Sequence, residues 1–169
     1  MMFKEMQNEP LILTLGLDAQ SEDFFNAQRN LYFPVERNFL AAHLTLFHQL
    51  PNSIDTINFI SNFRFPSFDM EISKLIKLGG GVAYSVNSKE LQQLHNDLKI
   101  QFKAILIPQD LQTFRPHITI QNKVSPPEAN LLFHKLQENF VPFFVKSINL
   151  HLWTYLGGPW RHEQTISLI

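Results

Sequence analysis

The chain carries two copies of a short pattern in which one aliphatic residue separates a histidine from a threonine. The copies are His43-Leu44-Thr45-Leu46 and His117-Ile118-Thr119-Ile120. Side chains alternate between the two faces of a strand, so each histidine shares a face with its threonine while the aliphatic residues pack behind. If the two strands face one cleft, two imidazoles and two hydroxyls converge on a shared ligand.

This set of side chains suits phosphodiester chemistry that needs no metal. Histidine titrates near neutral pH, so one imidazole can accept a proton while the other donates one to the leaving oxygen. Threonine hydroxyls can hydrogen-bond to the non-bridging phosphate oxygens, where charge accumulates. We therefore predict that His43, Thr45, His117 and Thr119 are catalytic. The alternative is a pair of structural histidines, which two copies at equivalent points of a repeat do not favour.

The elements that must position these residues form a repeat. Short apolar runs predict strands, and capped apolar stripes at helical spacing predict helices. The predicted strands are 11–17, 39–47, 68–78, 82–86, 104–107, 114–120, 143–155 and 165–168, and the predicted helices are 21–32, 53–63, 88–102 and 125–139. With the short run 104–107 set aside, the order strand, helix, strand, helix, strand occurs over about residues 11–78 and again over about 82–155. We expect a single domain over residues 1–169, made of two pseudo-twofold halves.

On these residues the chain resembles the 2H phosphoesterases, in the branch named 2′-5′ RNA ligase-like, whose hallmark is two His-x-Thr/Ser-x motifs. The likeness extends to residues 42–48, 80–84, 109–124 and 152–160, and touches most of the chain from about residue 11 to about 160. It implies a bilobal α+β fold, with antiparallel sheets flanking a central cleft and helices outside. It also implies cleavage of 2′,3′-cyclic phosphates, or reversible handling of 2′-5′ linkages in RNA, by the same four residues.

The residues around the second motif suggest how a phosphate would be neutralised. Several relatives carry an arginine shortly after this motif, where Gln121-Asn122-Lys123 stands here. Strand alternation places Arg115 and Lys123 on the face of His117, so we expect Lys123 first and Arg115 next to contact substrate. The alternative for both is a solvated strand end.

Aromatic residues of a late strand are candidates for contacts to a nucleobase. His151, Trp153 and Tyr155 alternate onto one face, and aromatic side chains beside a phosphate site could stack a base. Core packing is the alternative, mainly for Trp153, and Tyr155 is the one that we expect to bind substrate in the cleft. His48 follows His43 at an odd offset, which points it away from the cleft and favours a structural or rim role.

The charge balance and the lack of cysteine limit the classes of ligand and chemistry that we expect. Lys and Arg total 14 against 15 Asp and Glu, for a net charge of −1. Nothing in this balance favours duplex DNA or an anionic membrane. The sequence has no cysteine, which excludes thiol nucleophiles, disulfides and cysteine-type zinc sites. No apolar run approaches the roughly 20 residues of a membrane span, and the N-terminus has no apolar signal core.

From these features we expect a cytoplasmic monomer with no metal and no other cofactor. Its partners would be RNA ends or small cyclic phosphate nucleotides, which it would hydrolyse by two-histidine acid/base catalysis. Two other functions stay open: 2′-5′ RNA ligation by the same residues, and a non-catalytic RNA-binding module that uses the same cleft. A metal-dependent hydrolase is a further alternative, but it has no need of duplicated His-Thr motifs.

Overall fold

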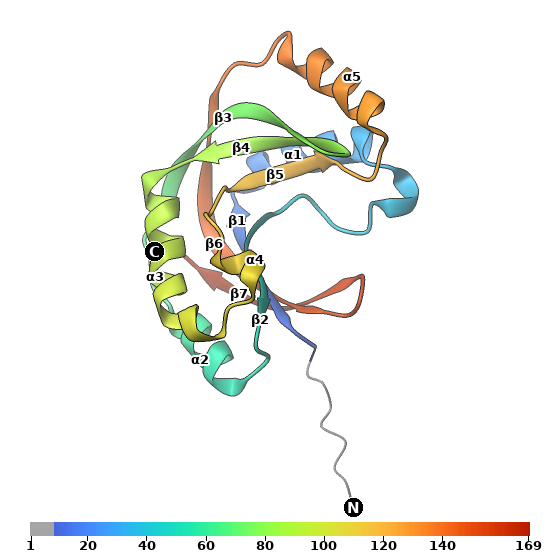
Figure 1. Cartoon of the computed structure of the whole chain (residues 1–169). Coiled ribbons are helices and arrows are strands. Elements are labelled where there is room, and N and C mark those ends of the chain that lie inside the picture. Colours follow the sequence, from blue (N-terminus) through green and yellow to red (C-terminus); the bar gives the residue numbers. More distant parts are fainter. Residues whose placement is uncertain (1–8) are drawn as a thin grey trace, which may run out of the picture.

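The computed structural model describes residues 9–169, in which seven strands form one sheet with helices packed against it (Figure 1). The strands are β1 (Leu11–Leu17), β2 (Leu44–Leu50), β3 (Phe68–Leu78), β4 (Gly81–Asn87), β5 (His117–Gln121), β6 (Phe143–Tyr155) and β7 (Trp160–Ser167). The α-helices are α1 (Ala19–Tyr32), α2 (Ile54–Asn62), α3 (Lys89–Phe102), α4 (Pro108–Leu111) and α5 (Pro126–Gln137). Two short 3₁₀ turns are η1 (Val35–Arg37) and η2 (Lys103–Ile105).

The strand pairing has the symmetry that the sequence repeat predicts. The strand order is β2-β1-β6-β3-β4-β5, all pairs are antiparallel, and β7 joins β6 outside this path. If β1, β2 and β3 are exchanged for β4, β5 and β6, the same order is read in reverse. The first half therefore relates to the second by a pseudo-twofold operation that passes between β3 and β6. Of the seven strands, β7 is the one without a counterpart.

Serine caps set the start of three helices. Ser53 and Ser88 each accept a hydrogen bond from the backbone N–H three residues later, and Ser125 forms a complete capping box with Glu128. Such caps satisfy amide groups that the first helical turn leaves unpaired. At α1 the cap is Asp18 and not Ser21: its carboxylate accepts from the Ser21 N–H at 3.0 Å and the Ser21 hydroxyl at 2.7 Å.

The two 14-residue helices, α1 and α3, each pack on the motif strand of the other half. On α1, the buried Arg29 donates through Nη1 to the Thr119 carbonyl of β5 at 3.1 Å. On α3, the buried His95 lies with Nε2 3.2 Å from the Leu46 carbonyl of β2 and stacks on Phe47. Each half therefore holds the motif strand of the other half in place.

Several predicted boundaries are wrong for local reasons. Residues 104–107 are not a strand: η2 continues the chain from α3, Ala104 and Ile105 are exposed, and only Leu106 is buried. The short helix α4 follows at once and was not predicted. The motif strands also begin later than expected, β2 at Leu44 and β5 at His117, so both histidines stand at the entry of their strands.

Candidate active site

Both His-x-Thr motifs lie at the edges of the sheet. β2 and β5 end the strand order, and the sheet curves so far that these two edge strands contact each other. A pocket of about 440 Å³ opens between them. Its lining residues are His43, Thr45, Leu46, His48, His95, Gln109, Asp110, Gln112, Thr113, Phe114, Arg115, His117, Thr119 and Trp160. All four residues predicted to be catalytic therefore face one pocket.

The two histidines are oriented in the same way. His43 places Nδ1 2.8 Å from the Ala41 carbonyl, and His117 places Nδ1 2.9 Å from the Arg115 carbonyl. A carbonyl oxygen can only accept, so each Nδ1 carries the proton of the bond. The carbonyl two residues upstream thus selects the tautomer in both motifs. Nε2 is left as the nitrogen that exchanges a proton, and no residue of the described chain occupies it in either ring.

The two threonines complete the set as unengaged donors. Thr45 and Thr119 are half-buried and lie on the same strand faces as their histidines. Within residues 9–169 neither hydroxyl has a hydrogen-bond partner, so both can donate to a ligand in the pocket. Two free hydroxyls beside two free imidazole nitrogens can receive a tetrahedral oxyanion such as phosphate.

The two imidazoles differ in their electrostatic setting. Desolvation lowers the pKa of His43 to about 4; the bond to the Ala41 carbonyl opposes this, and the charges of Arg29, His117 and His48 add to it. The indole of Trp160 contributes to the desolvation, since its ring centre lies 4.7 Å from that of His43. At neutral pH the unliganded protein therefore holds His43 in its uncharged form.

A buried cation lies behind the second motif. The Arg29 side chain is 5% exposed, and its Nε donates to Asn38 Oδ1 at 2.9 Å. Its guanidinium stacks over the ring of Phe33 at 4.0 Å, and burial lowers the pKa of Arg29 to about 10. No carboxylate of residues 9–169 pairs with it. An uncompensated positive charge is costly to bury, so its place behind Thr119 favours a negative ligand in front.

Asp110 ties α4 to the end of β2. Its buried carboxylate accepts from the backbone N–H groups of His48 and Gln49 at 3.0 and 3.1 Å, and from His48 Nδ1 at 2.8 Å. Although desolvation raises the pKa of Asp110, these bonds outweigh it and hold the pKa below the usual range. His48 thus lies at the pocket wall with its ring anchored to a carboxylate, as expected for a rim position.

Only one of the three predicted substrate-binding residues lines the pocket. Arg115 lines the pocket with the four motif residues. Lys123 does not: β5 ends at Gln121, its pairing to β4 shifts at that end, and Lys123 adopts a left-handed φ of 64°. Strand alternation therefore does not reach Lys123, which borders a different hollow beside Tyr32 and α5. Tyr155 is exposed on β6 and does not line the pocket either.

Several pocket residues were not predicted to have a place at the site, and three of them bring side chains that bear on its chemistry. Trp160 enters from β7, Asp110 from α4, and His95 from α3, where it is buried between the rings of Phe47 and Phe114. Burial lowers the pKa of His95 to about 4. None of the three belongs to a repeated motif; Asp110 and Trp160 lie in segments that resemble the family, but the resemblance assigned them no role.

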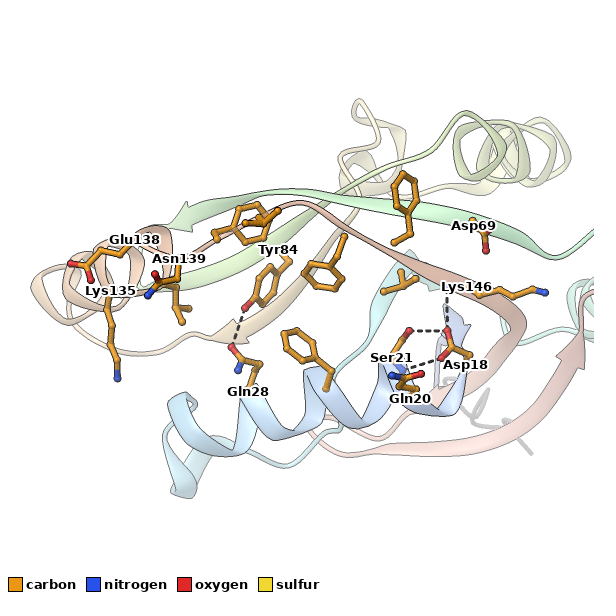
Figure 2. Close-up of a pocket in the computed structure, with 17 residues that line it drawn as sticks. Asp18, Gln20, Ser21, Gln28, Asp69, Tyr84, Lys135, Glu138, Asn139 and Lys146 are labelled. Carbon is orange, nitrogen blue, oxygen red and sulfur yellow. Dashed lines mark hydrogen bonds between the residues drawn. The ribbon is translucent and has the colours of Figure 1, made fainter.

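A larger hollow of about 940 Å³ lies between α1 and the opposite part of β6 (Figure 2). Aromatic rings dominate its walls, among them Phe24, Phe140 and Phe143. Two of its polar side chains are engaged within the fold: Tyr84 donates to Gln28 at 3.0 Å, and Asp18 caps α1. No histidine lines this hollow and neither His-x-Thr motif reaches it, so we do not regard it as the active site.

Within residues 9–169, no three His, Cys, Asp or Glu side chains gather as a metal site would require. No helix in this range is long and apolar enough to cross a membrane.

The model of the 2′-5′ RNA ligase superfamily matches residues 17–159. The chain belongs to this superfamily. The match spans both His-x-Thr motifs, and it confirms the resemblance to 2H phosphoesterases that the motifs predicted. No curated protein is similar enough to the chain to count as a relative.

Solved structures agree on the fold. A protein described as a phosphoesterase has a TM-score of 0.65 at 18% identity, covering 95% of this chain and 98% of its own. Escherichia coli LigT, crystallised with 3′-AMP, gives 0.62 at 18% identity, with 95% and 98% coverage. TT0787 of Thermus thermophilus gives 0.68 at 15% identity, with 94% and 97% coverage. The bilobal α+β fold class predicted for this superfamily member is confirmed.

Proposed function

We propose that the protein is a phosphodiesterase that hydrolyses 2′,3′-cyclic phosphates or 2′-5′ linkages at RNA ends or in nucleotides. The observation that carries this proposal is the matched pair of histidines. Both rings are fixed through Nδ1 to a carbonyl two residues upstream, and both Nε2 atoms are left for one pocket that also holds two free hydroxyls. Superfamily membership supports phosphoester chemistry at this place.

The proposed reaction on a cyclic phosphate is an in-line displacement. One imidazole takes a proton from water through Nε2, and the water oxygen forms a bond to phosphorus. The bond between phosphorus and one ribose oxygen breaks, and the second imidazole gives its Nε2 proton to that oxygen. The product is a ribose phosphate monoester, and the two histidines have exchanged protonation states.

The other pocket residues would stabilise the charge that builds up on phosphate. Thr45 and Thr119 would donate hydroxyl hydrogen bonds to the non-bridging oxygens, where donors placed in advance act most strongly. Arg115 is the exposed cation of the pocket and would approach the same oxygens. Arg29, buried behind Thr119, would add a fixed positive potential without touching the ligand.

Ligands of the structural relatives are in line with this substrate class. LigT has been crystallised with 3′-AMP, with phosphate, with ATP and with NADP+. All four carry a phosphate group, and three carry an adenosine. We therefore propose a nucleotide or an RNA end as the ligand of this chain as well.

Ligation is the second candidate, because the superfamily is named for 2′-5′ RNA ligase activity. In that direction a ribose hydroxyl replaces water as the nucleophile, and the same two histidines exchange the proton. Incubating a cyclic-phosphate end with a 5′-hydroxyl end, and analysing the product for a 2′-5′ linkage, separates ligation from hydrolysis.

The deciding experiment is hydrolysis of 2′,3′-cyclic nucleotides in the presence of EDTA. We expect turnover by the wild type and a loss of roughly 10²- to 10⁴-fold in His43→Ala and in His117→Ala. His134→Ala, which removes an exposed histidine on α5, is the matched control and should retain the wild-type rate. Wild-type turnover that survives both motif substitutions would refute the proposal, and turnover that EDTA abolishes would favour the metal-dependent alternative.

A substrate with a good leaving group assigns the two roles. A nitrophenyl phosphodiester releases its leaving group without protonation, so it does not need the general acid. Activity on this substrate should return in the variant that lacks the acid, and should stay low in the variant that lacks the base.

A further inference from the structure

The face that carries the catalytic residues continues far beyond the pocket. In the strand register, Thr45 of β2 lies opposite Thr14 of β1, Thr14 lies opposite His151 of β6, and His151 lies opposite Thr165 of β7. Residues directly opposite each other in antiparallel strands point to the same side. These four residues therefore form one row, which starts in the pocket at Thr45 and ends three strands away, at about 14 Å.

Aromatic rings line the path along this row. The ring of Trp160 stands 4.7 Å from that of His43, Trp153 stands 6.0 Å from Trp160, and His162 stands 4.9 Å from Trp153. Both indoles are half-buried, so part of each is open to solvent. A hydrogen bond of 2.9 Å from Trp153 Nε1 to Thr14 Oγ1 fixes one of them. Such rings can stack bases of any sequence.

Three polar atoms converge at the far end of the row. His151 Nδ1 lies 3.2 Å from His162 Nε2, and Thr165 Oγ1 lies 3.1 Å from each of them. No carboxylate within residues 9–169 pairs with either imidazole. Burial, and next the charge of His162, lower the pKa of His151. An anion placed here would accept hydrogen bonds from all three groups and remove the repulsion between the imidazoles.

A buried acceptor behind His151 supports this arrangement. Asn149 Oδ1 is buried and has no hydrogen-bond partner. It lies with His151 Nε2 over Gly16, where a Cβ would come within 2.8 Å of that Nε2 and would collide with the amide of Asn149. Glycine is therefore needed at position 16 for this close approach. The acceptor favours a proton on Nε2, so that a charged His151 would present its second N–H, at Nδ1, to a ligand.

We propose that this hairpin surface, formed by His151, Trp153, Trp160, His162 and Thr165, binds the continuation of an RNA strand whose terminal phosphodiester lies in the catalytic pocket. The indoles stack a base, and the two imidazoles with Thr165 hold a phosphate further along the strand than the adjacent one. Consecutive phosphates of one strand lie closer together than three strand spacings, so a mononucleotide cannot bridge the two positions. The inference rests on the proposed function, and it names oligonucleotide ends as the preferred substrate.

The test compares a 2′,3′-cyclic mononucleotide with a tetranucleotide that ends in the same cyclic phosphate. We expect kcat/KM of the wild type to be about tenfold or more higher for the tetranucleotide, given the strength of base stacking. His162→Ala and Thr165→Val should each reduce this ratio several-fold toward one. His134→Ala, on α5, removes an exposed histidine outside the hairpin surface and should leave the ratio at its wild-type value. Because the ratio is internal to each variant, a general loss of folded protein does not mimic the result.

Tryptophan fluorescence keeps the two proposals separable. The sequence has two tryptophans, Trp153 and Trp160, and both belong to the hairpin surface. A tetranucleotide ending in a 3′-phosphate should quench their emission, and His162→Ala should weaken its binding. A wild-type ratio near one, or a ratio that His162→Ala leaves intact, overturns the RNA-binding surface while the phosphodiesterase stands. If neither substrate is turned over, the cyclic-phosphate activity of the proposed function fails. Quenching that depends on His162 then still supports the surface, whereas its absence overturns the surface too.

Discussion

The two motif strands share the orientation of their histidines and differ in what surrounds them. On both strands, a carbonyl two residues upstream fixes Nδ1 of the histidine. His43 is also packed under Trp160, and its pKa is lowered to about 4, whereas no aromatic ring of the described chain contacts His117. The shared feature comes from the repeated strands. The difference comes from β7, which stands outside the repeat. The symmetric scaffold thus supplies two imidazoles held in the same way, and the added β6–β7 hairpin gives them different surroundings.

The largest effect is expected from removing the two threonine hydroxyls, which both motif strands share. Thr45→Val and Thr119→Val keep the side-chain shape and remove one donor each. If both hydroxyls act on the phosphate oxygens, each variant should lose roughly 10²- to 10³-fold in kcat, as for other donors to a developing oxyanion. Steady-state kinetics on a 2′,3′-cyclic nucleotide measures the effect.

Serine variants at the two positions sharpen this prediction. Thr45→Ser and Thr119→Ser retain the hydroxyl and should recover most of the rate. Equal losses in the two valine variants would show that the halves are used alike. A valine variant with wild-type kcat would remove that threonine from the proposed catalytic set.

The next largest effect concerns Asp110, which, like Trp160, contacts the first motif strand, β2. Asp110→Asn replaces one of two accepting oxygens by an NH₂ group that faces backbone donors of β2. We expect a loss of about 1–3 kcal/mol in the free energy of unfolding, because a buried donor is left without its acceptor. Urea unfolding measures it, with the exposed Asp23→Asn as a control that should change little.

The stability difference between wild type and Asp110→Asn should depend on pH in a defined direction. The pKa of Asp110 is lower in the folded chain than its usual value of 3.8. Its stabilisation is therefore fully present above that value and is lost as the pH falls through the folded pKa. The stability gap between wild type and Asp110→Asn should be constant near neutral pH and should close in acid. A gap that widens in acid would contradict the role of the charged carboxylate.

The sequence predicted the elements and motif residues that belong to the repeat. It did not predict the pocket residues that lie outside the repeat. β3 and β6 have their predicted bounds, and the helices predicted from residues 53, 88 and 125 begin directly after Ser53, Ser88 and Ser125. Each of these elements rests on a local pattern of apolar residues or on a single side chain. The same is true of the four motif residues, whose common pocket follows from strand alternation and a twofold relation.

The remaining site residues depend on tertiary packing. Trp160 and Asp110 approach the pocket from β7 and α4, at distances along the chain that no local pattern encodes. Lys123 shows the opposite failure: the alternation rule was extended past the end of β5, where a register shift and a positive φ turn the chain away. Alternation predicts which face a side chain occupies only for residues within the strand itself.

The difference between the two histidines should respond to Trp160. Removing the indole in Trp160→Ala admits water to His43, and because desolvation is the largest cause of the lowered pKa, that pKa should rise from about 4 toward 6.5. NMR titration of the imidazole carbon-bound proton measures it. Trp160→Phe keeps an apolar cover and should give a smaller rise. An unchanged pKa in Trp160→Ala would place the desolvation elsewhere.

The smallest effect is expected from Arg29, which contacts the second motif and influences the pKa of a histidine in the first. Arg29 belongs to α1, bonds the Thr119 carbonyl of the second motif, and acts by its charge on His43 of the first. Removing a positive charge makes protonation of His43 easier, so Arg29→Gln should raise its pKa, by less than Trp160→Ala because charge ranks below desolvation among the causes. Arg29→Lys keeps the charge and should leave that pKa nearly unchanged while it weakens the bond to Thr119. If Arg29→Lys shifts the pKa of His43 as much as Arg29→Gln does, the coupling runs through the position of β5 and not through charge.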